Sequence, residues 1–373
     1  MTPRNETPKE VPKKIHIVWV GGPIPEKYLD EIKVLSDLAQ SDGFELNLWV
    51  DNEKNFTSTL KKQVGQDVEL PKTHAGIKIR NISELEKRII NDEFYKENNR
   101  GRDFINAVSG EMTGFINMAA AADLLRYEIL RQEGGTYLDA DTKIIFEQES
   151  KFIDETPLLG FRANMTHRSS NHDGKVFLKS FVGGNDIIVS QPDHEILRTV
   201  ITTALEEYKN MGTQKYLATS QEDEKLAREK QLGFKINQDT TRADLKRFPY
   251  GVDTLVAPRR MATLQTTGPF ALSSAMETFW KNHPEHHSPE NLSSLTLDNN
   301  GLGTKTTFGI KVKSESDQVW LKKPATVRRS FDTDSIPHTL FGHGDSNQTA
   351  KAKIVDEKPA AIEENEKKSH GIK

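Results

Sequence analysis

The stretch TYLDADTKI, residues 136–144, places acidic and aromatic side chains at alternating positions. In a strand, Tyr137, Asp139 and Asp141 would point to one side, because successive side chains face opposite sides. Two carboxylates this close repel each other unless a cation or hydrogen-bond donors lie between them. A calcium loop is excluded, because the fifth and sixth positions counted from Asp139 are Lys143 and Ile144. A polar turn and a divalent-metal site at a strand end remain as interpretations.

A strongly helical segment comes directly before this stretch. FINMAAAADLLRYEILRQEGG, residues 115–135, is rich in alanine and ends in a glycine pair, which favours a helix with a left-handed C-cap. Asp123 and Arg126 are three residues apart and therefore neighbours on one helical face. Such pairs are commonly exposed, but the surrounding alanines and leucines indicate burial here. A buried ion pair that leads into two aspartates indicates a functional arrangement.

The N-terminal part of the chain predicts the sheet that would carry this site. IHIVWV, residues 15–20, is a continuous apolar run that stops at Gly21-Gly22-Pro23, as expected for a strand buried on both faces. Helical periodicity over 24–40 and a second apolar run at 44–51 complete a βαβ unit. Ligands of open α/β sheets bind beyond the carboxyl ends of the strands. The Gly21-Gly22 turn is therefore expected to form one wall of the site.

Composition restricts the class of protein further. The 373 residues carry a formal net charge of −4, so nothing favours a nucleic acid as partner. With no cysteine, disulfides, cysteine-ligated zinc and thiol catalysis are excluded. No apolar run approaches the roughly 20 residues of a membrane span, and the N-terminus does not resemble a signal peptide. We therefore expect a monomer that is cytoplasmic in the cell that produces it.

The order of motifs resembles a known family. NMAAAADLLRYEILRQEGGTYLDAD resembles the sugar-nucleotide-binding region of D-x-D glycosyltransferases, above all the glucosyltransferase domains of large clostridial toxins and related bacterial effectors. The resemblance implies a GT-A fold, an α/β architecture with a Rossmann-like, mostly parallel sheet flanked by helices. It implies transfer of a sugar of the glucose or N-acetylglucosamine type from a UDP-sugar, with retention and with Mn²⁺ or Mg²⁺ as cofactor. We expect a flexible arm at 1–12, the catalytic domain at 13–348 with a helical insertion at about 54–112, and a disordered tail at 349–373.

The same resemblance implies roles for individual residues. Trp19, with its neighbour Val18, would bind the uracil ring by stacking. Asp139 would lie near the ribose and the ion, with Asp141 as the direct metal ligand, and Arg126 would donate hydrogen bonds to phosphate. The other implied nucleotide-binding residues are Asn117, Asp123 and Tyr137.

Later segments resemble the family more loosely. FVGGNDIIVS, residues 181–190, reads as a strand whose Asn185 would touch the donor sugar, with Gly184 and Asp186 as alternatives if the alignment slips by one residue. TTGPFAL, residues 266–272, resembles a step near the catalytic cleft. Ala122 stands where the toxins have serine. Residues 330–349 are the candidate lid, or alternatively a polar loop. Its possible metal ligands are His343, Asp345 and Asn347.

Several alternatives stay open at this point. The acceptor is expected to be a host protein, and a bacterial glycan or capsule is the alternative. A sugar-nucleotide-binding protein without catalysis is a further possibility. A nucleotidyl- or phosphotransferase would need a third carboxylate on an adjacent strand and usually a G-S element, and the sequence places neither.

Three other features carry expectations of their own. The glutamate-rich end AAIEENEKKSHGIK resembles the signals of effectors delivered by type IV secretion, such as those of Legionella, so delivery into host cytosol is expected. The histidines of NHPEHHSP, residues 282–289, are expected in a surface loop, because no cysteine or carboxylate pattern completes a zinc site. We expect Trp49, Trp280 and Trp320 in the core or under the lid.

Overall fold

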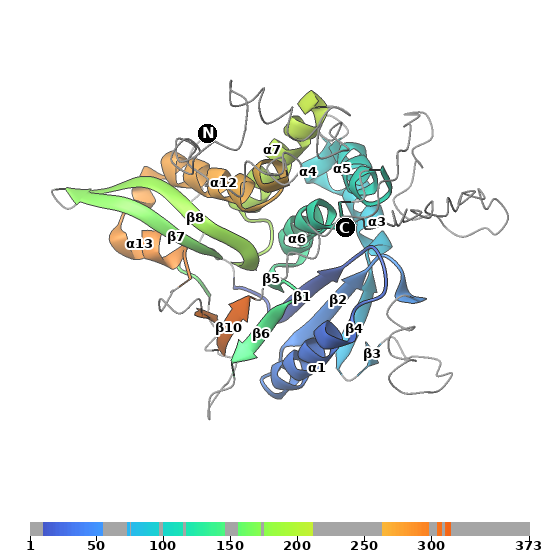
Figure 1. Ribbon diagram of the computed structural model, residues 1–373. Helices are drawn as coiled ribbons and strands as arrows, with labels where there is room; N and C mark the ends of the chain where they lie inside the picture. Colours follow the sequence, from blue (N-terminus) through green and yellow to red (C-terminus); the bar gives the residue numbers. More distant parts are fainter. Residues whose placement is uncertain are drawn as a thin grey trace, which may run out of the picture. The chain divides into compact units, whose positions relative to one another are not determined.

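The computed structural model describes residues 10–54, 73–74, 76–96, 100–114, 117–145, 156–172, 175–211, 263–297, 304–307 and 310–314. These residues form a seven-stranded sheet in the order β3-β4-β2-β1-β5-β8-β7 (Figure 1). Its centre is parallel and consists of β4 (Ile77–Asn81), β2 (Glu45–Val50), β1 (Lys14–Trp19) and β5 (Gly135–Leu138). The carboxyl ends of these four strands therefore meet at one edge of the sheet.

Antiparallel strands extend the sheet on both sides. The two-residue β3 (Thr73–His74) pairs with β4, while β8 (Lys175–Ser190) pairs with β5 and with β7 (Phe161–His172). The long β7–β8 hairpin extends away from the rest of the sheet (Figure 1). A second, three-stranded antiparallel sheet contains β6 (Thr142–Ile145), β10 (Ile310–Ser314) and β9 (Thr304–Thr307).

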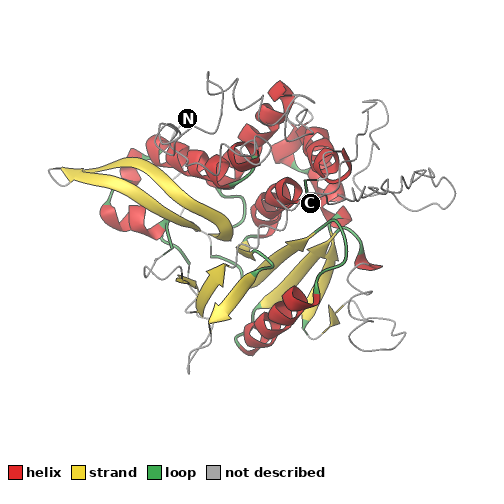
Figure 2. Ribbon diagram, viewed as in Figure 1, coloured by secondary structure: helices red, strands yellow, loops and turns green. Residues whose placement is uncertain are grey.

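Helices cover both faces of the main sheet, as the predicted α/β architecture requires (Figure 2). Ile15 and Ile17 of β1 belong to an apolar cluster with α1 (Glu26–Ser41), whereas Val18 belongs to a second cluster with α6 (Met118–Glu133). Other helices that contribute to that second cluster include α5 (Arg100–Ser109), α7 (Glu195–Met211) and α12 (Pro269–Asn282). Burial on both faces explains the unbroken apolar run of β1, and the predicted α/β fold is confirmed.

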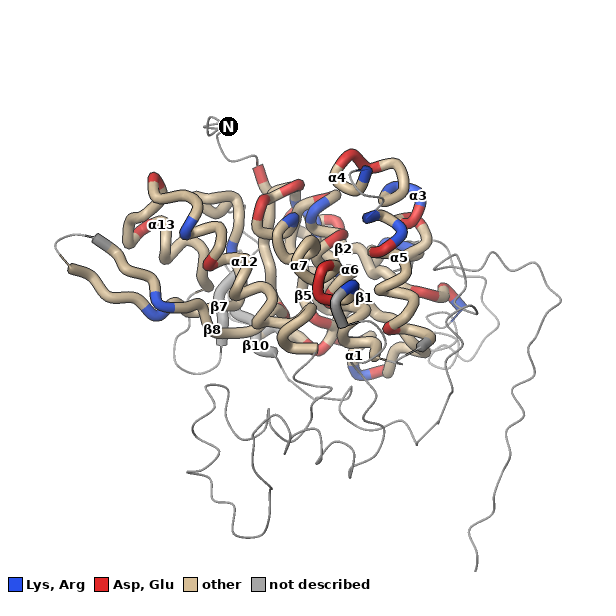
Figure 3. The backbone as a smooth tube through the Cα atoms, turned by 90° about the horizontal axis from the view of Figure 1, so that it is seen from above, with Lys and Arg blue, Asp and Glu red and all other residues tan. Residues whose placement is uncertain are grey.

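The expected helical insertion at about 54–112 is only partly helical in its described residues. Strand β4 lies inside this range and joins the main sheet, because Ile77 and Ile79 alternate with polar residues and pair with β2. The range then continues through α3 (Ser83–Asn91), α4 (Glu93–Lys96), α5 and the π-helical turn η2 (Gly110–Gly114). Both signs of charge are interspersed over α3, α4 and α5 (Figure 3).

After α12 the chain forms the short turn η4 (Pro284–His286) and α13 (Pro289–Ser294). No helix among the described residues is long and apolar enough to cross a membrane. Trp49 and Trp280 are buried in the core, as predicted. The expectations for the arm up to residue 9, for Trp320, for the lid at 330–349 with its three candidate ligands, and for the tail lie outside the described residues.

Candidate active site

The D-x-D segment lies in a turn at the carboxyl edge of the parallel strands. Strand β5 ends at Leu138, and the N–H of Thr142 donates a hydrogen bond to the carbonyl of Asp139 at 3.0 Å, which closes the turn. The alternation suggested that Asp139 and Asp141 lie on one face of a continuous strand. They lie instead in this turn, after the end of β5. The Tyr137 hydroxyl still reaches forward and donates to Asp139 Oδ1 at 2.7 Å.

Two glycines, Gly134 and Gly135, connect the end of α6 to the start of β5. Gly134 caps α6 with a φ of +63°, and its N–H donates to the carbonyl of Leu130. Gly135 follows at φ +96°, and a Cβ there would lie 2.6 Å from the carbonyl oxygen of Lys14 on β1. Only glycine fits both the conformation and this close approach. A glycine with positive φ thus ends α6, but its ψ of −163° places it outside the left-handed helical conformation that was predicted for the C-cap.

Arg126 connects three elements at this edge. Its Nη2 lies 3.1 Å from Asp123 Oδ1 on the same helix and 3.1 Å from Asp139 Oδ1 after β5. Its Nη1 donates to the carbonyl of Asn185 on β8 at 2.6 Å, and the guanidinium carbon lies 4.4 Å from the centre of the Tyr137 ring. Because the side chain is 6% exposed, these contacts fix a buried positive charge beside the D-x-D turn.

Asp123 is the most perturbed carboxylate of this group. Its Oδ1 accepts from Asn185 Nδ2 at 2.9 Å, and its Oδ2 accepts from Thr267 Oγ1 at 3.1 Å. Burial, which outweighs the attraction of Arg126, raises the pKa of Asp123 to about 6. The carboxyl group is therefore about half-ionised near pH 6 and mostly ionised at neutral pH. Thr267 belongs to the T-G-P step, which the sequence placed near the cleft.

Neighbouring residues on β8 have opposite roles. The Asn185 amide is turned into the buried cluster, where it also donates to the Tyr127 hydroxyl at 2.9 Å. Asp186 is on the other side of the strand, where its Oδ1 accepts from Asn164 Nδ2 at 2.6 Å. Its Oδ2 is buried and has no hydrogen-bond partner among the described residues. Asp186 is thus a third carboxylate at the site, on the strand adjacent to β5.

These carboxylates are close enough to influence one another. The N–H of Asp139 donates to the carbonyl of Asp186 at 2.9 Å. Burial raises the pKa of Asp139, and the charge of Asp186 adds to the shift, while Arg126 and the Tyr137 hydroxyl oppose it. Asp186 Oδ2 is buried without a hydrogen-bond donor among the described residues and lies near other negative charges. A bound cation would stabilise such an oxygen. The set of oxygen ligands fits a hard ion such as Mg²⁺ or Mn²⁺.

Three of the expected nucleotide-binding residues, Trp19, Val18 and Asn117, occupy different environments. Trp19 ends β1 and is partly exposed; its Nε1 donates to the carbonyl of Gly22 at 3.0 Å, and its ring lies 5.4 Å from that of Tyr28. Val18 is 5% exposed and packs in the core. Asn117 caps α6 through its Oδ1 and donates from Nδ2 to Thr263 Oγ1 at 2.9 Å. Each residue still borders the carboxyl edge, where β1 ends and α6 begins.

The glycine turn after β1 does form part of this edge. Gly21 has a φ of +90°, and a Cβ there would lie 2.5 Å from the side chain of Met118 at the start of α6. Its N–H donates to Asp51 Oδ2 at 3.0 Å, directly after β2. The turn therefore packs between two elements of the site, as expected from the βαβ pattern.

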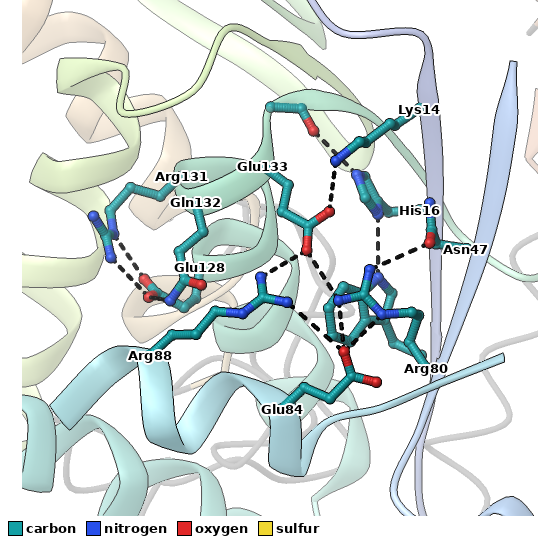
Figure 4. Close-up of polar contacts among 12 residues, drawn as sticks. Lys14, His16, Asn47, Arg80, Glu84, Arg88, Glu128, Arg131, Gln132 and Glu133 are labelled. Carbon is teal, nitrogen blue, oxygen red and sulfur yellow. Dashed lines mark hydrogen bonds and ion pairs between the residues drawn. The ribbon is translucent and has the colours of Figure 1, made fainter. Parts of the chain in front are cut away.

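A separate charged network holds α6 at the opposite, amino end of the sheet (Figure 4). Glu133 accepts hydrogen bonds from Lys14 at 3.0 Å, Arg80 at 3.2 Å and Arg88 at 2.8 Å. Burial alone would raise the pKa of Glu133, but these hydrogen bonds and nearby cations lower it to about 2. The recess beside the network has a volume of about 610 Å³ and is lined by the same paired charges. Its contacts bind β1, β4 and α3 to α6 and are structural.

The sheet with a parallel centre, the D-x-D turn at its carboxyl edge and the buried Asp–Arg pair facing that turn agree with what the resemblance to GT-A glycosyltransferases implies. Residues 13–109 and 72–149 match the family model of the TcdA/TcdB catalytic glycosyltransferase domain. The resemblance to the glucosyltransferases of clostridial toxins is thus confirmed for the part of the chain that contains β1, α6 and the D-x-D turn.

A curated relative and several solved structures are also similar. "Subversion of eukaryotic traffic protein A" of Legionella pneumophila is 29% identical over 133 residues, which are 35% of this chain and 17% of that protein. The UDP-bound glycosyltransferase domain of the YGT toxin is 13% identical, with a TM-score of 0.43 over 76% of this chain and 82% of that one. The catalytic domain of alpha-toxin from Clostridium novyi is 12% identical, with a TM-score of 0.43 over 84% and 80%.

Proposed function

We propose that this chain transfers a sugar of the glucose or N-acetylglucosamine type from a UDP-sugar to a host protein, with a divalent ion and with retention of configuration. The observation that carries the proposal is the position of Arg126, fixed between Asp123 and Asp139 at the edge where the D-x-D turn lies. The match to the toxin-type catalytic domain supports the same reaction class.

The chemistry of each side chain at the carboxyl edge of the sheet indicates its role in the proposed reaction. Asp139 and Asp141 would hold Mn²⁺ or Mg²⁺, with Asp186 as a third oxygen donor. When bound, such an ion neutralises the negative charge that develops on a leaving diphosphate. Arg126 supplies a fixed donor fork next to these carboxylates. Asp123 and Asn185, whose polar atoms converge at 2.9 Å, are suited to orient sugar hydroxyl groups, and Trp19 would support the base.

A nucleotidyl- or phosphotransferase is the second candidate. It requires a third carboxylate on a neighbouring strand, and Asp186 on β8 supplies one. The products distinguish the two reactions: a glycosyltransferase releases UDP, whereas a nucleotidyl- or phosphotransferase breaks a phosphoanhydride or phosphoester bond within the nucleotide.

The central experiment is a hydrolysis assay with the full chain. Purified protein is incubated with UDP-glucose or UDP-N-acetylglucosamine, with Mn²⁺, with Mg²⁺ or with a chelator, and products are followed by ³¹P and ¹H nuclear magnetic resonance. We expect UDP and free sugar, formed only with metal, and the first-formed anomer reports retention. UMP and sugar 1-phosphate as products would favour the second candidate, while tight binding of the UDP-sugar without turnover would favour a binding protein.

The acceptor requires a separate experiment. Host-cell lysate is incubated with enzyme and a labelled UDP-sugar, and modified proteins are identified by mass spectrometry. A labelled host protein supports the interpretation that this chain is an effector. That interpretation also includes delivery into the host cytosol. Labelling of bacterial envelope glycan alone would favour a glycan or capsule enzyme.

A further inference from the structure

The turn after α12 places His283, Glu285 and His286 close to Glu195, which lies 88 positions earlier in the sequence than His283. His283 ends α12, and its N–H donates to the carbonyl of Phe279 at 3.1 Å. His283 Nδ1 lies 2.8 Å from Glu285 Oε1, and its Nε2 lies 2.8 Å from Oε2 of Glu195, the first residue of α7. The histidines lie in a surface turn, as predicted, and the structure adds two carboxylates, Glu285 and Glu195, that contact His283.

Three of these side chains converge in a way that suits a metal ion. One ligand atom from each of His283, Glu285 and His286 lies within 4.8 Å of the others. Glu285 Oε1 is 2.8 Å from His283 Nδ1 and 3.9 Å from His286 Nε2. A tetrahedral zinc ion with bonds of about 2.0–2.2 Å holds adjacent ligand atoms about 3.4 Å apart. One observed separation is shorter and the other longer than this value, so small side-chain rotations suffice to bring the ligand atoms to tetrahedral positions.

The position of Glu195 strengthens the case. A metal-binding histidine commonly donates its other ring N–H to a carboxylate, which fixes the tautomer and the ring orientation. Glu195 occupies that position on the far nitrogen of His283, so that Nδ1 is directed toward Glu285. A chance cluster of charged surface residues would not be expected to place a carboxylate on one ring nitrogen of His283 and a second possible ligand beside the other.

The rings are also held in place before any ion binds. Phe279 is buried, and its ring centre lies 4.6 Å from that of His283 and 6.2 Å from that of His286. Pro284 begins the tight η4 turn, in which the N–H of His286 donates to the carbonyl of His283 at 3.0 Å. The two histidine side chains remain 23% and 35% exposed, so an ion has access from solvent.

We propose that His283, Glu285 and His286 form a binding site for Zn²⁺ or a similar divalent transition-metal ion, with Glu195 as the carboxylate that orients His283. Two imidazoles and one carboxylate are a ligand set that zinc favours, with a fourth position open to water. The ion would hold the η4 turn after α12, and the contact between Glu195 and His283 Nε2 would connect this turn to the start of α7. Because α12 has 14 residues, this site lies about 21 Å along the helix from Thr267. It is separate from the D-x-D turn and does not depend on the proposed reaction.

Zinc titration of the full chain, after chelator treatment, tests the proposal. All proteins carry Asp139→Asn and Asp141→Asn, so that zinc bound by the D-x-D turn does not contribute. We expect one zinc equivalent by isothermal titration calorimetry that is lost in Glu285→Gln and in His286→Ala. Glu195→Gln should weaken zinc about 10- to 100-fold without removing the site. With Co²⁺ as probe, the site should give the visible absorption bands of a low-symmetry, four-coordinate ion.

His287→Gln is the matched control, because this neighbouring histidine instead contacts the carbonyl of Trp280 at 2.6 Å; its zinc affinity should equal that of the parent. Circular dichroism and melting temperature without metal establish that each variant is folded. The proposal is overturned if folded Glu285→Gln and His286→Ala variants bind zinc as the parent does. A Glu195→Gln variant with unchanged affinity would overturn the orienting role of Glu195.

Discussion

The hydroxyl of Thr267 donates a hydrogen bond to Asp123 Oδ2 at 3.1 Å across 144 positions of sequence, and both residues are buried. A hydrogen bond to an ionised group stabilises it by about 1.5–3 kcal/mol. Thr267→Val keeps the shape but removes this donor, so the already raised pKa of Asp123 should rise by a further one to two units, roughly. We expect the acidic limb of the pH–rate profile of UDP-sugar hydrolysis to move upward by that amount. Thr278→Val, an exposed position of α12, the helix that begins two residues after Thr267, should leave the profile unchanged, and an unshifted limb in both variants would contradict the role of Thr267.

Asp139→Asn and Asp141→Asn should each abolish metal-dependent turnover while the protein stays folded. Loss of a carboxylate weakens the binding of the ion. The negative charge that develops on the leaving diphosphate then loses several kcal/mol of stabilisation. Asp103→Asn, an exposed carboxylate in the first turn of α5, is the control and should retain full activity. Turnover is measured against Mn²⁺ concentration together with the melting temperature. Near-normal turnover in either folded variant would exclude the metal assignment.

Trp19→Ala should weaken UDP binding by roughly 1–3 kcal/mol, by analogy with base–aromatic stacking. Trp19→Phe retains a ring but loses the hydrogen bond to Gly22, so it should recover most of the affinity. Calorimetric titration with UDP measures both. If UDP affinity is unchanged while the melting temperature falls sharply, Trp19 supports the loop after β1 and does not bind the base.

The buried ring of His194 should make the protein less stable in acid. Its Nδ1 accepts from the N–H of Ile196 at 3.1 Å and its Nε2 contacts the carbonyl of Leu159 at 2.9 Å. The neutral ring therefore already uses both nitrogens. Burial lowers the pKa of His194 from 6.5 to about 4, so between these values the unfolded chain binds a proton that the folded chain does not. The free energy of unfolding contributed by this ring is full above pH 6.5 and falls toward pH 4, by up to about 3 kcal/mol.

Denaturant unfolding of the wild type and of His194→Gln between pH 7.5 and 4.5 measures this term. The comparison is needed because the raised pKa of Asp123 acts in the opposite direction, stabilising the fold as pH falls through about 6. We expect the difference in unfolding free energy between the two proteins to shrink as pH falls. A difference that is constant over this range would contradict the prediction.

Local sequence determined the order and type of the elements around the D-x-D turn. The continuous apolar run of β1, the alanine-rich helix and the Gly134-Gly135 pair each act over a few neighbouring residues, through burial, helix propensity and allowed backbone angles. The i,i+3 spacing of Asp123 and Arg126 likewise predicted their contact, observed at 3.1 Å. These features could be predicted because the interactions that produce them are local.

Contacts between segments far apart in the chain, in contrast, follow from the tertiary structure alone. Strand β4 was missed because its five residues are stabilised by pairing with β2 more than by their own pattern. Asp186 becomes a third carboxylate, and Asn185 turns inward, only once β8 pairs with β5 and sends adjacent side chains to opposite faces. Glu195 meets His283 across 88 positions because α7 packs on α12. Such contacts depend on the packing of whole elements, and no local pattern in the sequence encodes them.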